Sequence, residues 1–187
     1  MELVIRIGKF FYNSLQIFLV FAAILLVIYI FVLEPHQVDG ISMFPTFHNG
    51  DLLLSYLLPV RFDQLKRGDV VVFNSPTEED KLFIKRVIAI PGERIMVQNG
   101  GVYINGAKFD ESAYLAPTVM TYGGASIPDG QQITVPQGDL VVMGDNRENS
   151  SDSRAWGPLD KKKLIGKSIM RVWPLNTIEI IKNPMKN

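Results

Sequence analysis

Cysteine is absent from this chain of 187 residues, and histidine occurs only twice. The lack of cysteine excludes a disulfide-stapled scaffold, a cysteine-ligated zinc site and a thiol nucleophile. Charge of one sign is not in excess either, since 19 Lys and Arg balance 19 Asp and Glu. This balance excludes a strongly basic nucleic-acid binder and a disordered acidic chain. The carboxylates show no metal-ligand spacing, so the sequence predicts no metal and no cofactor.

One long hydrophobic run lies near the N-terminus. Residues from Phe10 to Leu33 carry no charge, and about 20 apolar helical residues cross the ~30 Å core of a bilayer. The run is too long for the hydrophobic part of a cleaved signal peptide, and no small-x-small cleavage site follows it. It is hydrophobic on every face, which disfavours the alternative of a buried core helix. The sequence therefore predicts a membrane anchor over residues 10–33.

Charges on the two sides of this run predict its orientation. Arg6 and Lys9 precede it, whereas no Lys or Arg follows until Arg61. Positively charged flanks stay on the cytoplasmic side of a membrane. We therefore expect residues 1–9 in the cytoplasm and residues 34–187 outside it.

The remainder of the chain is typical of a β protein. Short β-branched runs are separated by turn signals, at residues 52–57, 70–73, 82–90, 95–98, 102–104, 133–135, 140–143, 168–173 and 177–181. Many short strands without interleaved helices predict a mainly β fold, a sandwich or a barrel-like sheet. The Gly- and Pro-rich residues 105–136 are predicted to form a small excursion from it, and Lys161–Ile165 a short helix. Arg67-Gly68-Asp69 matches a cell-adhesion tripeptide, but a turn before a strand is the better interpretation.

A serine in a proline-stiffened turn is the first candidate for chemistry. Ser42 lies in the sequence Asp-Gly-Ile-Ser-Met-Phe-Pro-Thr, residues 39–46. Such a turn can present a hydroxyl and a backbone N–H to one point, as a nucleophile with an oxyanion hole requires. Glycine, serine and proline are equally common in ordinary loops, which is the alternative at this point.

Two adjacent cations in an apolar strand are the second candidate. Strand alternation over residues 82–90 puts Lys85 on one face and Arg86 on the other, and both faces are otherwise apolar. Arginine keeps its proton in proteins, whereas a buried lysine can lose it. Lowering the lysine pKa by about three units from ~10.4 would make Lys85 a usable general base. The alternative is that both cations reach solvent at a strand edge.

A polar loop after an apolar strand is the third candidate. Residues 143–157 are dense in Asp, Asn, Ser and Arg. The composition is similar to a calcium loop, but Arg147 falls where an oxygen ligand is needed. A network that positions another catalytic group is the better functional interpretation, with an ordinary solvated loop as the alternative.

In this order, the three segments resemble the bacterial type I signal peptidases. The matching motifs are Gly-x-Ser-Met-x-Pro-Thr at 40–46, Lys-Arg-Val-x-x-x-Pro-Gly-Glu at 85–93 and Gly-Asp-Asn-Arg-x-x-Ser-x-Asp-Ser-Arg-x-x-Gly at 144–157. The anchor and residues 67–73 also match the layout of that family, so the resemblance covers essentially the whole chain. It implies a β-rich serine endopeptidase with a Ser–Lys dyad, anchored in the bacterial plasma membrane, that removes signal peptides from exported proteins.

The resemblance implies a role for each matching residue. Ser42 is then the nucleophile, Lys85 the general base, and Ser150 the serine that hydrogen-bonds and orients the lysine amine. The backbone N–H of Ser42 gives one oxyanion donor. Some relatives have a serine two positions earlier as the second donor, and since Gly40 stands there in this chain, the second donor stays open. The supporting loop comprises Gly144, Asp145, Asn146 and the charge pair of Asp152 and Arg154.

Substrate preference has a physical basis. An extended peptide alternates its side chains, so the residues one and three before the cut face the enzyme together. By similarity, the shallow apolar pockets that accept these small side chains are lined by Val38, Phe47 and Ile84. The implied partners are precursor proteins with signal peptides, the lipid bilayer and the secretion machinery, and no nucleic acid. The link of residues 34–41 spans at most ~30 Å, so Ser42 stays close to the lipid, where we expect Phe44, Phe47, Leu57 and Leu58 either at the interface or in the core.

Three other functions compete with this interpretation. A Ser-His-Asp hydrolase would use His36 or His48, the latter on the same loop as Ser42 with Asp51 near it. A self-cleaving Ser–Lys protease of the repressor type is disfavoured by the anchor, because those proteins are soluble. A tethered β domain that only binds peptides would need neither Ser42 nor Lys85.

Overall fold

A computed structural model describes residues 1–57 and 65–185, apart from the side chains of residues 2–4 and 27–31. In chain order its elements are α1 (Glu2–Val32), β1 (Leu33–Gln37), β2 (Leu52–Tyr56), β3 (Val70–Asn74), β4 (Leu82–Ala89), β5 (Arg94–Gln98), β6 (Gly101–Ile104), β7 (Ala107–Lys108), β8 (Gln132–Thr134), β9 (Asp139–Met143), η1 (Arg147–Asn149), α3 (Ser153–Trp156), β10 (Leu159–Asp160), η2 (Lys161–Lys163), β11 (Leu164–Trp173), η3 (Leu175–Thr177) and β12 (Glu179–Ile180).

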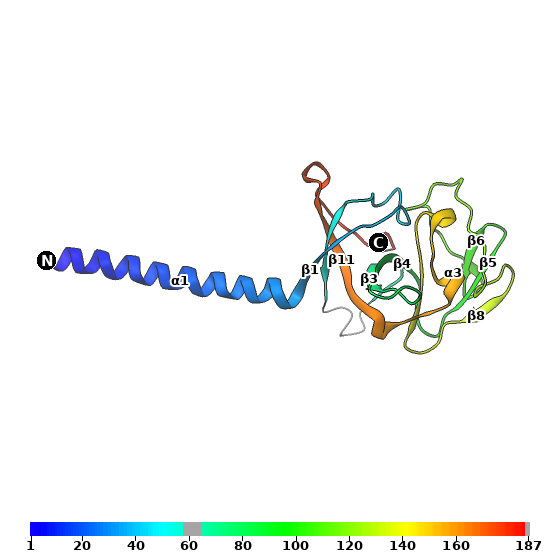
Figure 1. The fold of residues 1–187 in the computed structure, drawn as a ribbon, viewed down its shortest axis with the longest axis horizontal. Helices are drawn as coiled ribbons and strands as arrows, with labels where there is room; N and C mark the ends of the chain where they lie inside the picture. Colours follow the sequence, from blue (N-terminus) through cyan, green and yellow to red (C-terminus); the bar gives the residue numbers. More distant parts are fainter. Residues whose placement is uncertain (58–64, 186–187) are drawn as a thin grey trace.

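The N-terminal helix α1 stands apart from the rest of the molecule. It projects from the β part as a single long rod (Figure 1). Its stretch Ile5–Leu26 has a mean hydropathy of 1.7, and no part of the most apolar window is buried. By length and composition this helix could cross a membrane. The helix ends at Val32, and Leu33 already begins β1.

The β part contains two antiparallel sheets, which confirms the mainly β fold. In the larger sheet the strand order is β1-β2-β11-β3-β4-β9-β10, with β12 beside β11. Because β1 and β10 lie at opposite ends of this order, the described strands form an open sheet and not a closed barrel. The smaller sheet has the order β7-β6-β5-β8.

Strand β4 crosses the centre of the larger sheet and carries both cations of the second motif. On one side β3 pairs with its first part, from Val70↔Arg86 to Asn74↔Leu82. On the other side β9 pairs only from Arg86 onward. Among the described strands, the first half of β4 is thus hydrogen-bonded on one side only, and its free edge lies at the cleft described below.

The smaller sheet overlaps the excursion predicted at residues 105–136 but begins before it. Residues 105–136 contribute β7, β8 and the loops around them, while β5 and β6 precede that range. A shared core joins the two sheets; it is formed by Ile88, Ala89, Ile95, Val97, Val102, Ile104, Ile127, Val135, Val141 and Met143. Burial of so many aliphatic side chains holds the excursion against β4 and β9.

Three local sequence expectations differ from the structure or are resolved by it. The short helix predicted at Lys161–Ile165 is confirmed only in its first three residues: η2 is one 3₁₀ turn capped by the Asp160 side chain, which accepts from the Lys162 N–H, and β11 starts at Leu164. Strand β1, which the sequence did not predict, pairs with β2 along its length. Asp69 of the adhesion-like tripeptide is buried and ion-paired with Lys167, so it is not a surface ligand.

The apolar residues expected at the lipid interface have different environments. Phe44 is 48% exposed, whereas Phe47 is fully buried. Leu57 is half-buried, and Leu58 lies outside the described residues. Phe44 therefore remains available to a surrounding apolar phase, and Phe47 belongs to the core.

Candidate active site

The turn after β1 presents Ser42. Gly40 has a φ of +93°, a left-handed conformation that favours glycine, and this lets the chain turn sharply before the serine. The Gly40 N–H donates to Asn49 Oδ1 at 2.8 Å, so it does not point into the cleft as an oxyanion donor. In the described part of the chain no hydrogen bond engages the Ser42 N–H. That N–H remains available to a ligand.

Lys85 of β4 meets the serine directly. Its Nζ donates to Ser42 Oγ at 2.6 Å, and the residue is only 4% exposed. Burial lowers the pKa of Lys85 from 10.5 to about 8, and the charges of Asp152 and Asp145 offset part of that lowering. The ammonium also lies 5.2 Å from the centre of the Phe83 ring. Desolvation is therefore what makes this amine readily deprotonated.

The loop after β9 closes on the serine turn. The Asn146 N–H donates to the Ser42 carbonyl at 3.0 Å, and Asn146 Nδ2 donates to the Ile41 carbonyl at 3.2 Å. Gly144 packs so closely that a Cβ there would overlap both the Ser42 carbonyl oxygen and Ser150 Oγ. A glycine is required at this point, because any side chain would push the loop and the turn apart.

Asp152 and Arg154 hold that loop from within. Arg154 Nε and Nη2 each donate to the Asp152 carboxylate at 2.8 Å, and Asp152 also accepts from the Gly144 N–H. Burial by itself would raise the pKa of Asp152, but the hydrogen bond and charge of Arg154, with smaller contributions from Ser150 and Gly144, hold it below its usual range. Asp152 is thus a fixed anion that fastens the two ends of the loop.

Ser150 lies beside this pair rather than on the lysine. Its hydroxyl is buried, packs against Gly144, and meets no hydrogen-bond partner at normal geometry among the described residues. A hydrogen bond from Ser150 to Lys85 is therefore not present in this structure, and the orienting role stays a prediction. Its interaction with the Asp152 carboxylate, which helps to lower the pKa of Asp152, places the hydroxyl beside that anion instead.

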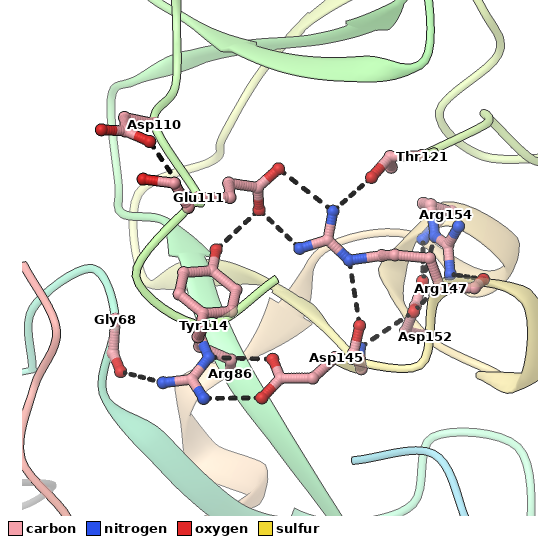
Figure 2. A network of polar contacts seen from close by, with 12 residues as sticks. Gly68, Arg86, Asp110, Glu111, Tyr114, Thr121, Asp145, Arg147, Asp152 and Arg154 are labelled. Carbon is pink, nitrogen blue, oxygen red and sulfur yellow. Dashed lines mark hydrogen bonds and ion pairs between the residues drawn. The ribbon is translucent and has the colours of Figure 1, made fainter. Parts of the chain in front are cut away.

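A second ion pair, which sequence reasoning missed, lies on the other face of β4. Arg86 donates to both oxygens of Asp145, from Nε at 2.9 Å and from Nη2 at 2.6 Å (Figure 2). Asp145 also accepts from Thr46 Oγ1 at 2.6 Å, which joins the serine turn to the loop. The adjacency of Arg86 to Lys85 was visible in the sequence, but its partner is 59 positions away.

A cleft of about 240 Å³ runs past Ser42 and Lys85. It is lined by Gln37, Val38, Asp39, Gly40, Ile41, Ser42, Met43, Leu82, Phe83, Ile84, Lys85, Asn149 and Ser151. Two of the three predicted pocket residues, Val38 and Ile84, lie in its wall. Phe47 does not: it packs beneath the wall in a core cluster with both of them. Its ring is fully buried in that cluster and does not reach the cleft at Ser42.

The histidines lie elsewhere. The His48 ring packs edge-on against Phe44, and His36 is buried in β1 with its Nε2 3.9 Å from Glu34 Oε2. In residues 1–57 and 65–185, the described hydrogen bond of the Ser42 hydroxyl is to Lys85 and not to an imidazole. The same residues contain no group of three His, Asp or Glu side chains placed to hold a metal ion. The geometry therefore favours lysine over histidine as the partner of Ser42.

The arrangement has the parts of an acyl-transfer site. A serine hydroxyl touches a buried amine, a free backbone N–H lies at the serine, and a cleft with an unpaired strand edge passes both. These are the features of a serine hydrolase that acts on an extended peptide.

Comparisons with known proteins agree with that class. The family model described as "Signal peptidase, peptidase S26" matches residues 11–173. A probable signal peptidase I-2 of Synechocystis is 37% identical over 81% of this chain and 68% of its own length. A signal peptidase IB of Staphylococcus aureus is 33% identical over 86% of this chain and 88% of its own length. A crystal structure of a signal peptidase I from Enterococcus faecalis matches with a TM-score of 0.44 and 27% identity, over 55% of this chain and 95% of that one.

The chain belongs to the S26 signal peptidase family. It is thus a serine peptidase, and signal peptide cleavage is the activity of its family.

Proposed function

We propose that this protein is a membrane-anchored endopeptidase that cleaves signal peptides from exported precursors with Ser42 as nucleophile and Lys85 as general base. The observation that carries the proposal is the 2.6 Å contact between Lys85 Nζ and Ser42 Oγ at a site where burial lowers the lysine pKa to about 8. A hydroxyl needs a base beside it to attack a peptide bond at neutral pH, and a neutral amine at that distance is one.

The reaction follows from these two groups. Neutral Lys85 takes the Ser42 proton as Oγ attacks the scissile carbonyl, and the Ser42 N–H stabilises the developing oxyanion. The lysine ammonium then gives the proton to the departing amine of the mature protein, which leaves the signal peptide as an ester on Ser42. Lys85, neutral again, takes a proton from water as that water attacks the ester. The signal peptide leaves as a carboxylic acid, and the proton returns to Ser42 Oγ.

The unpaired edge of β4 is suited to an extended substrate. Residues Leu82–Ile84 have a strand partner on one side only, and Gln37–Gly40 form the opposite wall of the cleft. A peptide that adds as a strand there would place alternate side chains against Val38 and Ile84. A cleft of only about 240 Å³ favours small side chains one and three residues before the cut.

Helix α1 and the short link after it support the membrane part of the proposal. We place α1 across the plasma membrane with Arg6 and Lys9 on the cytoplasmic side and the β part outside. The serine turn follows β1 directly, so the site stays near the lipid, where an uncut signal peptide ends. Because the chain has no cysteine, a Ser112→Cys variant tests this orientation: an impermeant thiol reagent should label it in intact cells.

The dyad is tested with detergent-solubilised full-length protein and a precursor substrate. Ser42→Ala and Lys85→Ala should each lose cleavage, and full activity in either variant refutes the dyad. His48→Ala is the control and should cleave normally, because its ring does not contact Ser42. The parent rate should rise with pH through about 8, since the active form is the one in which Lys85 has lost its proton. A flat profile contradicts the role of Lys85.

A further inference from the structure

One carboxylate of residues 105–136 contacts the loop that follows β9 at the active site. Glu111 lies in the loop between β7 and β8, and its two oxygens accept from Nη2 and Nη1 of Arg147, the latter at 3.2 Å (Figure 2). The Arg147 side chain is 0% exposed. Among the described residues Glu111 is the carboxylate that pairs with this buried guanidinium, and no family motif in the sequence includes it.

Arg147 is part of the loop that closes on Ser42. It begins η1, three residues before Ser150, and its Nε donates to the Gly144 carbonyl at 3.0 Å. Its own carbonyl accepts from Arg154 Nη2 at 2.7 Å. The guanidinium therefore fixes the same Gly144 that packs between the Ser42 carbonyl and Ser150.

A tyrosine extends the contact to the other half of the site. Tyr114 Oη donates to Glu111 Oε1 at 2.6 Å, and the Arg86 guanidinium lies 4.2 Å from the centre of the Tyr114 ring. Burial raises the pKa of Tyr114, so the hydroxyl keeps its proton and remains a donor to Glu111. Glu111 and Tyr114 thus touch both the residue after Lys85 and the loop that carries Ser150.

We propose that Glu111 is a positioning residue, which acts through Arg147 to hold the Gly144–Ser150 loop in register with Ser42 and Lys85. The inference rests on the proposed Ser–Lys function. Without Glu111, the buried guanidinium loses the one carboxylate paired with it among the described residues, keeps only the more distant charge of Asp145, and must move toward water. That movement pulls on the Gly144 carbonyl, loosens the contact with Ser42, and admits water to the Lys85 amine.

The excursion makes no direct contribution to the cleft. None of the cleft-lining residues lies between positions 99 and 136. Loss of Glu111 should therefore lower kcat while KM changes by less than about threefold, because misplacement of reacting groups by about 1 Å is enough to cost 10²-fold in rate. We expect Glu111→Gln to lower kcat by about 10- to 100-fold, and Glu111→Asp to restore part of it.

The pH profile separates positioning from simple loss of folded protein. The groups that face Lys85 are the carboxylates of Asp145 and Asp152, the Ser42 hydroxyl and the Phe83 ring. Water entry weakens the desolvation of the amine, so the midpoint of the rate profile in Glu111→Gln should move upward by about 0.5–1 pH unit. Removal of a negative charge alone would move it downward, and a smaller folded fraction would leave it in place.

The experiment measures kcat, KM and the pH profile of the full-length protein in detergent. Asp110→Asn is the matched control, since it removes the adjacent charge from an exposed residue that contacts Ser112 and not Arg147. Tyr114→Phe is the milder variant, and it should lower kcat by about threefold with a small upward shift of the midpoint. If Glu111→Gln fails to fold, Tyr114→Phe decides.

Unchanged kcat and midpoint in the folded Glu111 variant, or in Tyr114→Phe where only that variant folds, overturn the inference. Ser42→Ala, measured in the same series, keeps the two proposals apart. An inactive Ser42→Ala beside a parent-like Glu111→Gln refutes the positioning role alone, whereas an active Ser42→Ala refutes the dyad itself.

Discussion

Strand β4 carries two neighbouring cations on opposite faces, and among the described residues only one of them is paired with a carboxylate. Lys85 and Arg86 are almost equally buried, at 4% and 2% exposed. Arg86 is paired through two hydrogen bonds with Asp145, whereas no carboxylate in the described part of the chain lies within ion-pair distance of Lys85. An arginine cannot lose its proton and so must be paired to be buried, while a lysine can be buried unpaired by giving its proton up. Strand β4 thus carries a permanently charged side chain, Arg86, next to Lys85, which can lose its charge.

The largest effect on activity should come from replacing Lys85 with a residue that cannot lose its proton. Lys85→Arg keeps the charge and removes the ability to accept a proton, so kcat/KM should fall about 10²- to 10⁴-fold, the usual contribution of a general base. Cleavage of a precursor peptide at pH 9 by the detergent-solubilised enzyme measures it. Lys81→Arg is the control, because this exposed lysine pairs with Glu78 at the surface. More than a tenth of the parent activity in Lys85→Arg would mean that charge, and not proton transfer, is what the site uses.

The second effect comes from removing the counter-charge on the opposite face. Asp145→Asn leaves Arg86 buried and unpaired, which should lower the free energy of unfolding by about 3–5 kcal/mol. Urea unfolding followed by the fluorescence of Trp156, which packs on Phe73 in the core, measures the change. The surface control Glu78→Gln should cost less than about 1 kcal/mol. If Asp145→Asn lost no more stability than the control, the Arg86 side chain would be able to reach water. The two cations of β4 would then not differ in their need for a paired carboxylate.

From the sequence alone, the role of Lys85 on one face of β4 could be predicted far better than the ion pair of Arg86 on the other face. Lys85 and Ser42 lie in short motifs from which a nucleophile and a base can be predicted. The β fold can be predicted from runs of alternating β-branched residues. The ion-pair partners of Arg86 and Arg147 cannot be predicted from the sequence. Packing brings Asp145 to Arg86 from 59 positions away and Glu111 to Arg147 from 36 positions away. Any of several carboxylates would have matched the sequence equally well.

The local errors have the same origin. Residues 161–165 have helical propensity, but Leu164 pairs with Phe73 of β3 and the sheet takes the segment. Leu33–Gln37 contains a proline and no alternation, yet it forms the edge strand β1, where a missing N–H can face solvent. In each case a contact between distant segments outweighs a local preference.

The smallest effect sharpens the comparison, because it concerns stability at the unpaired site. In the folded protein Lys85 has a pKa of about 8 against an ordinary 10.5, so below pH 8 folding must bury its charge. Lys85→Met should therefore be about 1–3 kcal/mol more stable than the parent at pH 7, although it is inactive.

The pH dependence of that gap distinguishes a displaced pKa from better packing of methionine. Between pH 8 and 10.5 the unfolded parent binds more protons at Lys85 than the folded parent does, so the parent gains stability as the pH rises while the variant gains none from this group. The gap should thus shrink by about 1–3 kcal/mol from pH 7 to pH 10.5, whereas for Lys162→Met, at an exposed lysine, it should stay constant. A Lys85→Met gap that is the same at both pH values would mean that the buried amine keeps its ordinary proton affinity, and Lys85 would then differ from Arg86 only in its neighbours and not in its chemistry.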